Sequence, residues 1–213
     1  YLQPKCNMAT GELVSMEALA RWQKSDGTFV SPEEFIPLFE SSGFITRFDM
    51  YIWKSVCKTL AAWQDKGCKL VPISINVSMI DITNIDVPQY LSMLTEQYHI
   101  SPEYLPVEIT ESVFAESNTI VKNTITRFHK KGFYVLMDDF GSGYSSLNVL
   151  KDANVDYLKL DMKFMQIDAK NKGKGIQILK SIVDMAHRLD LVIIAEGVET
   201  KEQSEILKSM NCN

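Results

Sequence analysis

Two adjacent carboxylates, Asp138 and Asp139, end an apolar run of this 213-residue chain. The loop sequence "FGSGYSSL" follows them, and its residues Gly141 and Gly143 permit a sharp turn. Neighbouring carboxylates at the end of a buried strand repel each other, so a cation is needed beside them. The pair therefore predicts a site for a positively charged group, and the other strand ends indicate which kind.

Polar groups end the other apolar runs as well. They are Glu17, Asn76, Glu108 with Glu111 just beyond, Lys159 with Asp161, and Glu196 with Glu199. A solvated strand end or a helix cap is the simpler interpretation for any one of them, but not for the whole set. Oxygen ligands without His or Cys favour Mg²⁺ or Mn²⁺ over Zn²⁺. Two such ions, between which Asp138 and Asp139 would divide their carboxylates, are typical of in-line displacement at phosphorus.

Lys159 allows three interpretations. The first is a structural counter-ion among acids, the second is the Schiff-base nucleophile of an aldolase, and the third is a group that orients a metal-bound water. The third fits a metal cluster best, because an aldolase needs no such cluster. The tripeptide "DFG" at 139–141 does not indicate a kinase, since the chain has neither a glycine-rich phosphate loop before it nor an H-R-D catalytic loop.

The elements that must position these residues alternate along the chain. Strand-like runs at 1–6 and 13–19 predict an antiparallel hairpin, and helices are predicted at 32–42 and 46–66. Strand–helix pairs follow, with strands at 71–78, 104–110, 133–139, 155–161 and 191–197 and helices at 87–98, 119–131, 144–150, 176–189 and 201–209. Buried strands that alternate with helices indicate a parallel sheet. Because no dinucleotide-type glycine fingerprint is present, a closed barrel is favoured over an open doubly wound sheet.

Composition restricts the class of protein and of partner. The chain is 46% hydrophobic and 23% charged, and its net charge of −5 argues against nucleic-acid polymers and anionic membranes as partners. The four cysteines show no metal-binding spacing and are expected to be reduced thiols of a cytoplasmic domain. The sequence has neither a membrane-spanning run nor a signal peptide. Because it does not open with Met, we expect it to be excised from a longer protein.

Eight segments match one protein family in order along the chain. They are "YLQPK", "EALARW", "SPEEFIPLFE", "INVS", "VEITES", "MDDFGSGYSSL", "YLKLD" and "IAEGVET". On these segments the chain closely resembles the EAL domain, the bacterial phosphodiesterase of cyclic di-GMP. The resemblance implies one domain over residues 1–213 and a (β/α)8 TIM-like barrel with an antiparallel first strand. It also implies hydrolysis of one phosphodiester of cyclic di-GMP, which gives linear pGpG.

The resemblance further implies roles for individual residues. Catalytic roles are expected for Glu17, Lys159, Glu196 and Asp139. Lys159 would hold the nucleophilic water, and Glu196 would be a metal ligand or the general base. The ligands of a two-metal Mg²⁺ or Mn²⁺ site are expected to be Glu17, Asn76, Glu108, Asp138, Asp139 and Glu196.

Substrate contacts and loop supports follow from the same resemblance. Gln3, Leu19, Arg21 and Asp49 are expected to contact the substrate. Arg21 would pair with phosphate oxygens and Asp49 would accept from a guanine edge. Glu111, Gly141 and Glu199 are expected to stabilise the loop that follows Asp139.

The chain departs from the family pattern at its end, because an eighth strand is expected beyond Asn213. A barrel that lacks one strand has two unpaired edges. The alternative function is a non-catalytic receptor module for cyclic di-GMP, although the sequence keeps every metal ligand that the family pattern requires. A homodimer is a possible assembly. An upstream GGDEF or sensory domain is expected in the full-length protein, which could be anchored to a membrane through that upstream region.

Overall fold

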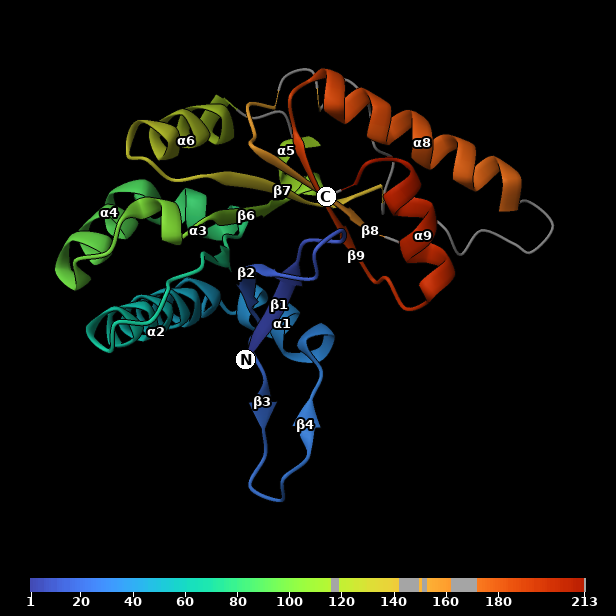
Figure 1. Ribbon diagram of the computed structural model, residues 1–213. Coiled ribbons are helices and arrows are strands. Elements are labelled where there is room, and N and C mark those ends of the chain that lie inside the picture. Colours follow the sequence, from blue (N-terminus) through green and yellow to red (C-terminus); the bar gives the residue numbers. More distant parts are fainter. Residues whose placement is uncertain (116–118, 142–149, 151–152, 162–171, 213) are drawn as a thin grey trace.

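The computed structural model describes residues 1–115, 119–141, 150, 153–161 and 172–212. In this part of the chain seven strands form one curled sheet in the order β1-β2-β5-β6-β7-β8-β9 (Figure 1). The strands are β1 (Leu2–Cys6), β2 (Leu13–Ala18), β5 (Ile73–Asn76), β6 (Val107–Thr110), β7 (Val135–Phe140), β8 (Tyr157–Asp161) and β9 (Val192–Glu196). β1 pairs antiparallel with β2, and every later neighbour pairs parallel.

This topology confirms the predicted barrel type with an antiparallel first strand. Among the described residues β1 and β9 are the two edges of the sheet, and no eighth strand joins them. The curled sheet therefore has a concave inner face and an outer face. From β2 onwards the strands of this sheet run in one direction, because each pairs parallel with the next, so their carboxyl ends lie at one common rim (Figure 1).

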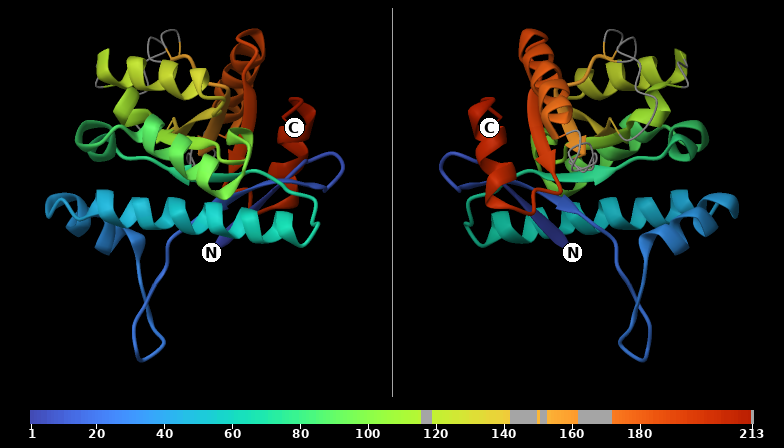
Figure 2. Two further views of the ribbon diagram at one scale, coloured as in Figure 1. Left: turned by 90° about the vertical axis from the view of Figure 1, so that its left-hand side faces the viewer. Right: turned by 90° about the vertical axis from the view of Figure 1, so that its right-hand side faces the viewer.

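Helices surround the sheet on its outer side (Figures 1 and 2). They are α1 (Pro32–Ser41), α2 (Ile45–Asp65), α3 (Met79–Asn84), α4 (Val87–Tyr98), α5 (Glu111–Ala115), α6 (Thr119–Lys130), α8 (Lys172–Arg188) and α9 (Lys201–Ser209), with a short 3₁₀ helix at Pro102–Tyr104. Trp53 of α2 is fully buried, and its indole N–H donates to the carbonyl of Asn76 at 3.0 Å. This bond links α2 to the end of β5 at Asn76, which is itself a predicted site residue. No helix in the described ranges is long and apolar enough to cross a membrane.

The outer face of the sheet supplies the hydrophobic core. Apolar side chains such as Ile75, Val107, Ile109, Met137 and Leu158 are 0–3% exposed and pack beneath the helices. Each buried side chain of this kind contributes about 1.5–3 kcal/mol. Because side chains alternate along a strand, the residues between these positions point to the concave face. The concave face is therefore free to hold polar groups.

Several short elements were not predicted from the sequence, among them α5 and the 3₁₀ helix. A hairpin of β3 (Trp22–Gln23) and β4 (Phe29–Val30) extends away from the body of the molecule (Figure 2), and α3 is inserted before α4. Strands of two residues and a helix of six are too short to show a period in the sequence. The side chain of Ser78 accepts from the N–H of Asp81, which returns a bond to Ser78 and caps α3. The helix predicted at 144–150 falls almost wholly outside the described residues.

Candidate metal centre

Strand register brings the predicted site residues to one level of the concave face. In the parallel pairs Glu17 lies beside Ser74, and Asn76 beside Glu108. Further round the sheet Thr110 lies beside Asp138 and Asp161 beside Glu196. Directly paired residues of neighbouring strands point to the same side of a sheet. The polar groups from six strands therefore face one space near the carboxyl ends of the strands.

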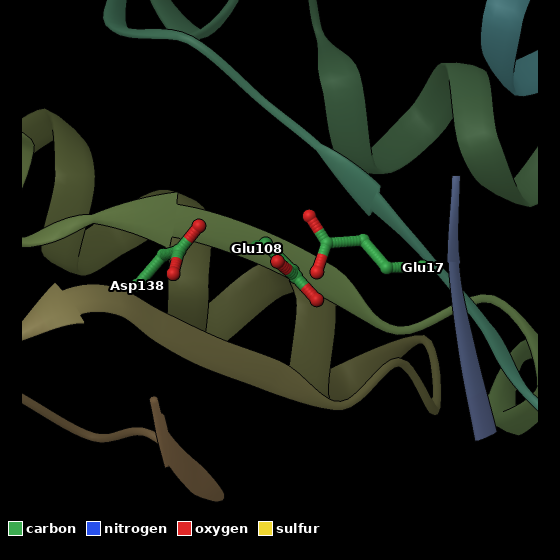
Figure 3. A group of neighbouring side chains, drawn as sticks. All are labelled: Glu17, Glu108 and Asp138. Atoms are coloured by element: carbon green, nitrogen blue, oxygen red, sulfur yellow. The ribbon is translucent and has the colours of Figure 1, made fainter. Parts of the chain in front are cut away.

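Three carboxylates form the centre of this space. Glu17, Glu108 and Asp138 each contribute an oxygen atom that lies within 4.8 Å of the other two. The three residues are 7%, 1% and 8% exposed, so water screens their charges poorly. Figure 3 shows the Glu108 carboxylate between those of Glu17 and Asp138 on the inner side of the strands. Among the described residues this is the group of acids that could hold a metal ion.

Lys159 enters the same cluster from β8 and is 1% exposed. Its Nζ lies 3.0 Å from Glu17 Oε2, 3.0 Å from Asp138 Oδ1 and 2.9 Å from Glu196 Oε1. It also donates to Oε2 of Glu108. One ammonium therefore pairs with four carboxylates, which makes Lys159 the central cation of the cluster.

A second ammonium in the cluster, that of Lys5 on β1, was not among the residues predicted from the sequence. Its Nζ lies 2.6 Å from Glu108 Oε1, 3.1 Å from Ser74 Oγ and 3.3 Å from Glu17 Oε2. A signal was present in the hairpin, because β1 pairs Gln3 with Glu17 and Lys5 with Ser15. An inward Glu17 places Gln3, Lys5 and Ser15 on the same inner face.

The electrostatics of the cluster show an excess of acid over base. Burial raises the pKa of Asp138 to about 6 and that of Glu196 to about 7, and the Lys159 ammonium offsets this only in part. Burial also acts on Glu17, but the ammoniums of Lys159 and Lys5 outweigh it and hold its pKa below the ordinary value. Burial lowers the pKa of Lys159, yet the surrounding carboxylates raise it by more, so this group keeps its proton at neutral pH.

A divalent cation fits this donor set. Two ammoniums face four carboxylates, those of Glu17, Glu108, Asp138 and Glu196. Two negative charges remain when all four acids are ionised, and one divalent ion neutralises two. Asn76 lies on the exposed rim beside Glu108 and adds a neutral oxygen. Oxygen donors without sulfur or imidazole suit a hard cation.

Asp139 stands apart from the three buried acids. Its φ of +56° is unusual for a residue other than glycine, and its N–H donates to Asp138 Oδ1 at 2.8 Å. The register between β7 and β8 shifts between Met137 and Phe140 at the same point. Such an irregularity re-aims a side chain, and Asp139 is exposed while Asp138 is buried. The two adjacent acids therefore lie in different surroundings, Asp138 in the buried cluster and Asp139 at the exposed rim.

The residues predicted to stabilise the loop after Asp139 make different contacts. Glu111, at the start of α5, accepts from the N–H of Gly141 at 3.1 Å. Gly141 has φ of +96°, a conformation that favours glycine. Glu199 is exposed, and its N–H donates to Oε1 of Gln203 at the start of α9. The Glu111 contact fixes the first residue of the loop after β7, and the later part of that loop lies outside the described residues.

Three predicted substrate contacts lie at the start of the chain. Gln3 pairs with Glu17 across the hairpin and is exposed. Leu19 is half-buried, and its N–H and carbonyl bond to Tyr1 at 2.9 and 3.0 Å. Arg21 is exposed and donates to the carbonyl of Ala20 at 2.8 Å. Gln3 therefore adjoins the acid cluster, while Arg21 lies beyond the end of β2.

Asp49, the fourth predicted substrate contact, has an acidic neighbour that the sequence did not indicate. It lies on α2 against Asp81 of α3, which is fully buried. Burial first, and then the charge of Asp81, raise the pKa of Asp49 to about 9. Asp81 Oδ2 accepts from Ser78, whereas Oδ1 has no partner among the described residues. Asp49 is therefore protonated at neutral pH.

The curled, mostly parallel sheet and the acidic cluster at its strand ends define a protein of the α/β-barrel class with a candidate metal centre. The model of the EAL domain family matches residues 1–213, and the chain belongs to this family. The Probable cyclic di-GMP phosphodiesterase PdeB of Escherichia coli (strain K12) is 36% identical over 209 residues, which cover 98% of this chain and 39% of that protein. The Cyclic di-GMP phosphodiesterase PA2567 of Pseudomonas aeruginosa is 30% identical and is matched over 99% of this chain and 36% of its own length.

Solved structures agree with this assignment. The cyclic di-GMP complex of the PaMucR phosphodiesterase matches with a TM-score of 0.91 and 29% identity, over 100% of this chain and 85% of that one. The FimX EAL domain of Pseudomonas aeruginosa bound to cyclic di-GMP matches with a TM-score of 0.87 at 20% identity, over 99% of this chain and 84% of that one. At that identity the second match shows the fold only.

Proposed function

We propose that this domain hydrolyses one phosphodiester bond of cyclic di-GMP and releases linear pGpG. The observation that supports the proposal most is the buried cluster of Glu17, Glu108 and Asp138 around Lys159. Relatives named as cyclic di-GMP phosphodiesterases and a solved cyclic di-GMP complex support the choice of substrate. The chain spans 39% and 36% of the length of the two relatives described above.

The metal-binding residues would be Glu17, Asn76, Glu108, Asp138, Asp139 and Glu196, with Mg²⁺ or Mn²⁺ as the ion. When bound, divalent ions would supply an activated water and would neutralise charge on the phosphate. The burial of the cluster excludes bulk water from around these charges, which strengthens every interaction with the phosphate.

Other residues of the chain would bind the substrate and handle the proton. Glu196 is suited to accept a proton, because burial raises its pKa to about 7. Lys159 pairs with four carboxylates, so one of its three N–H donors would have to leave them before it could hold the water in line with the phosphorus. Arg21 would pair with phosphate oxygens and Gln3 and Leu19 would contact the nucleotide. Asp49 would have to lose its proton before it could accept two hydrogen bonds from a guanine edge.

A product assay tests the proposal. The purified domain is incubated with cyclic di-GMP and Mg²⁺, and the nucleotides are separated by chromatography. We expect pGpG to accumulate with the wild-type chain and not with Glu17→Ala or Asn76→Ala, which each remove one hard ligand. Cyclic di-GMP that binds but stays intact would identify the domain as a receptor module instead.

A further inference from the structure

Lys5 occupies a place in the cluster that differs from that of Lys159. It projects from β1, the antiparallel edge strand, and only 10% of its side chain is exposed. An ammonium has three N–H donors. Those of Lys5 meet three oxygen neighbours, Glu108 Oε1 at 2.6 Å, Ser74 Oγ at 3.1 Å and Glu17 Oε2 at 3.3 Å. Two hydrogen bonds and one further ion pair therefore hold the ammonium within the protein.

The two lysines contact different oxygens of the Glu108 carboxylate. Lys5 pairs with Oε1 and Lys159 with Oε2 of this carboxylate. Lys159 additionally pairs with Asp138 and Glu196, the acids nearer the rim. The ion pairs of Lys5 in the described structure are with Glu17 and Glu108. Lys5 thus contacts Glu108 through the carboxylate oxygen that Lys159 does not contact.

We propose that Lys5 is a positioning residue of the metal centre, which fixes Glu108 so that only its Oε2 is offered to a divalent cation. This inference rests on the proposed function. The bond to Oε1 prevents the carboxylate from rotating to bind an ion through both oxygens. Ser74 is 2% exposed, donates to the carbonyl of Met16 at 3.2 Å and holds the lysine in place. Lys5 also places a fixed positive charge beside the site, and this charge weakens the binding of a divalent cation.

Removal of the ammonium then has two opposite effects. A cation binds more tightly, because a like charge has left a poorly screened site. Catalysis becomes slower, because Glu108 can turn and the ion and water are displaced from the productive geometry. A purely structural lysine would instead weaken binding and catalysis together when it is lost. The opposite signs distinguish a positioning role from a structural one.

The experiment compares Lys5→Met with wild type in two assays. Calorimetric titration with Mn²⁺ alone gives the affinity for the ion, and steady-state cleavage of cyclic di-GMP at saturating Mn²⁺ gives kcat and KM. We expect Lys5→Met to bind Mn²⁺ at least about tenfold more tightly, and to lose about 10²-fold in kcat with little change in KM. Lys58→Met, which removes one exposed lysine of α2, is the matched control and should behave as wild type.

Two further variants keep the test decisive if Lys5→Met folds poorly. Lys5→Arg keeps the charge and should keep the wild-type affinity for Mn²⁺ while it lowers kcat, because a planar guanidinium holds Glu108 differently. Ser74→Ala keeps the ammonium but removes one of its supports, so it should keep the wild-type affinity for Mn²⁺ and lower kcat less than Lys5→Met does. Affinity and kcat within twofold of Lys58→Met in all three variants, or a parallel loss of both, would overturn the inference. If wild type binds Mn²⁺ without cleaving, the proposed function fails, and the affinity of Lys5→Met still tests Lys5.

Discussion

Replacement of Lys159 by Met removes the cation that pairs with four carboxylates. The side chain keeps its approximate volume, so the main loss is electrostatic. Three of its oxygen neighbours lie at 2.9–3.0 Å and the site is 1% exposed. Loss of one partner from a buried ion pair costs about 3–5 kcal/mol, because the remaining charges are left uncompensated. In a domain of 150–250 residues about 1 kcal/mol shifts Tm by about 2–4 °C. We therefore expect Lys159→Met to melt about 6–20 °C below wild type in the presence of a chelator.

Mn²⁺ should restore part of this loss, because a cation that binds the folded chain stabilises it. The effect should be larger in the variant, because its carboxylates no longer have the Lys159 ammonium beside them. Thermal melting with chelator and with saturating Mn²⁺ measures both values, and Lys180→Met on the exposed side of α8 is the control. The rise in Tm on addition of Mn²⁺ should be larger for Lys159→Met than for wild type. A melting temperature within about 2 °C of the control in chelator would refute the view that Lys159 holds the acid cluster together.

Three other variants test separate parts of the site. Lys159→Arg keeps the charge but changes the donor geometry, so kcat should fall at least about 10²-fold with little change in KM, as steady-state kinetics would show; a loss of only a few-fold would leave Lys159 a structural counter-ion. Asp139→Asn should bind cyclic di-GMP in calorimetry but not cleave it, because Asp139 is exposed at the β7 irregularity and outside the buried cluster; loss of binding would make it part of the ligand site. The raised pKa of Asp49 stabilises the fold fully below its unfolded value of 3.8, and this contribution is lost as pH rises towards about 9. Between those pH values the free energy of unfolding of wild type, measured with urea, should therefore fall by up to about 1.4 kcal/mol per pH unit. Asp49→Asn should lack this fall, and an equal pH slope for both proteins would contradict the assignment.

The site residues at the strand ends were predictable, because an apolar strand segment and the polar residue that ends it can both be recognised within one short stretch of sequence. Glu17, Glu108, Asp138 and Lys159 each follow apolar positions in their own segments, and parallel strands necessarily bring such ends together. The partition of Asp138 and Asp139 between buried and exposed surroundings was less accessible, because it depends on a positive φ and a register shift. Register between strands is set by the packed structure and not by one segment.

Lys5 and Asp81 act through contacts whose partners the sequence patterns do not specify. Lys5 acts across the sheet on Glu108, 103 positions away in the chain, and its type is common on surfaces. Asp81 looks like an ordinary helix cap, and it performs that role for α3. Its effect on the pKa of Asp49 arises from the packing of α2 against α3. Both effects are contacts between segments that have no common pattern.

Hydrolysis in ¹⁸O-labelled water tests the central claim most directly. If the acid cluster directs water onto the phosphorus, the reaction with cyclic di-GMP and Mg²⁺ should yield pGpG with one ¹⁸O atom in its terminal phosphate, detected by mass spectrometry. Glu17→Ala should give no labelled product under the same conditions. Cyclic di-GMP recovered intact from a folded, ligand-bound wild-type domain, or pGpG without the label, would contradict the account.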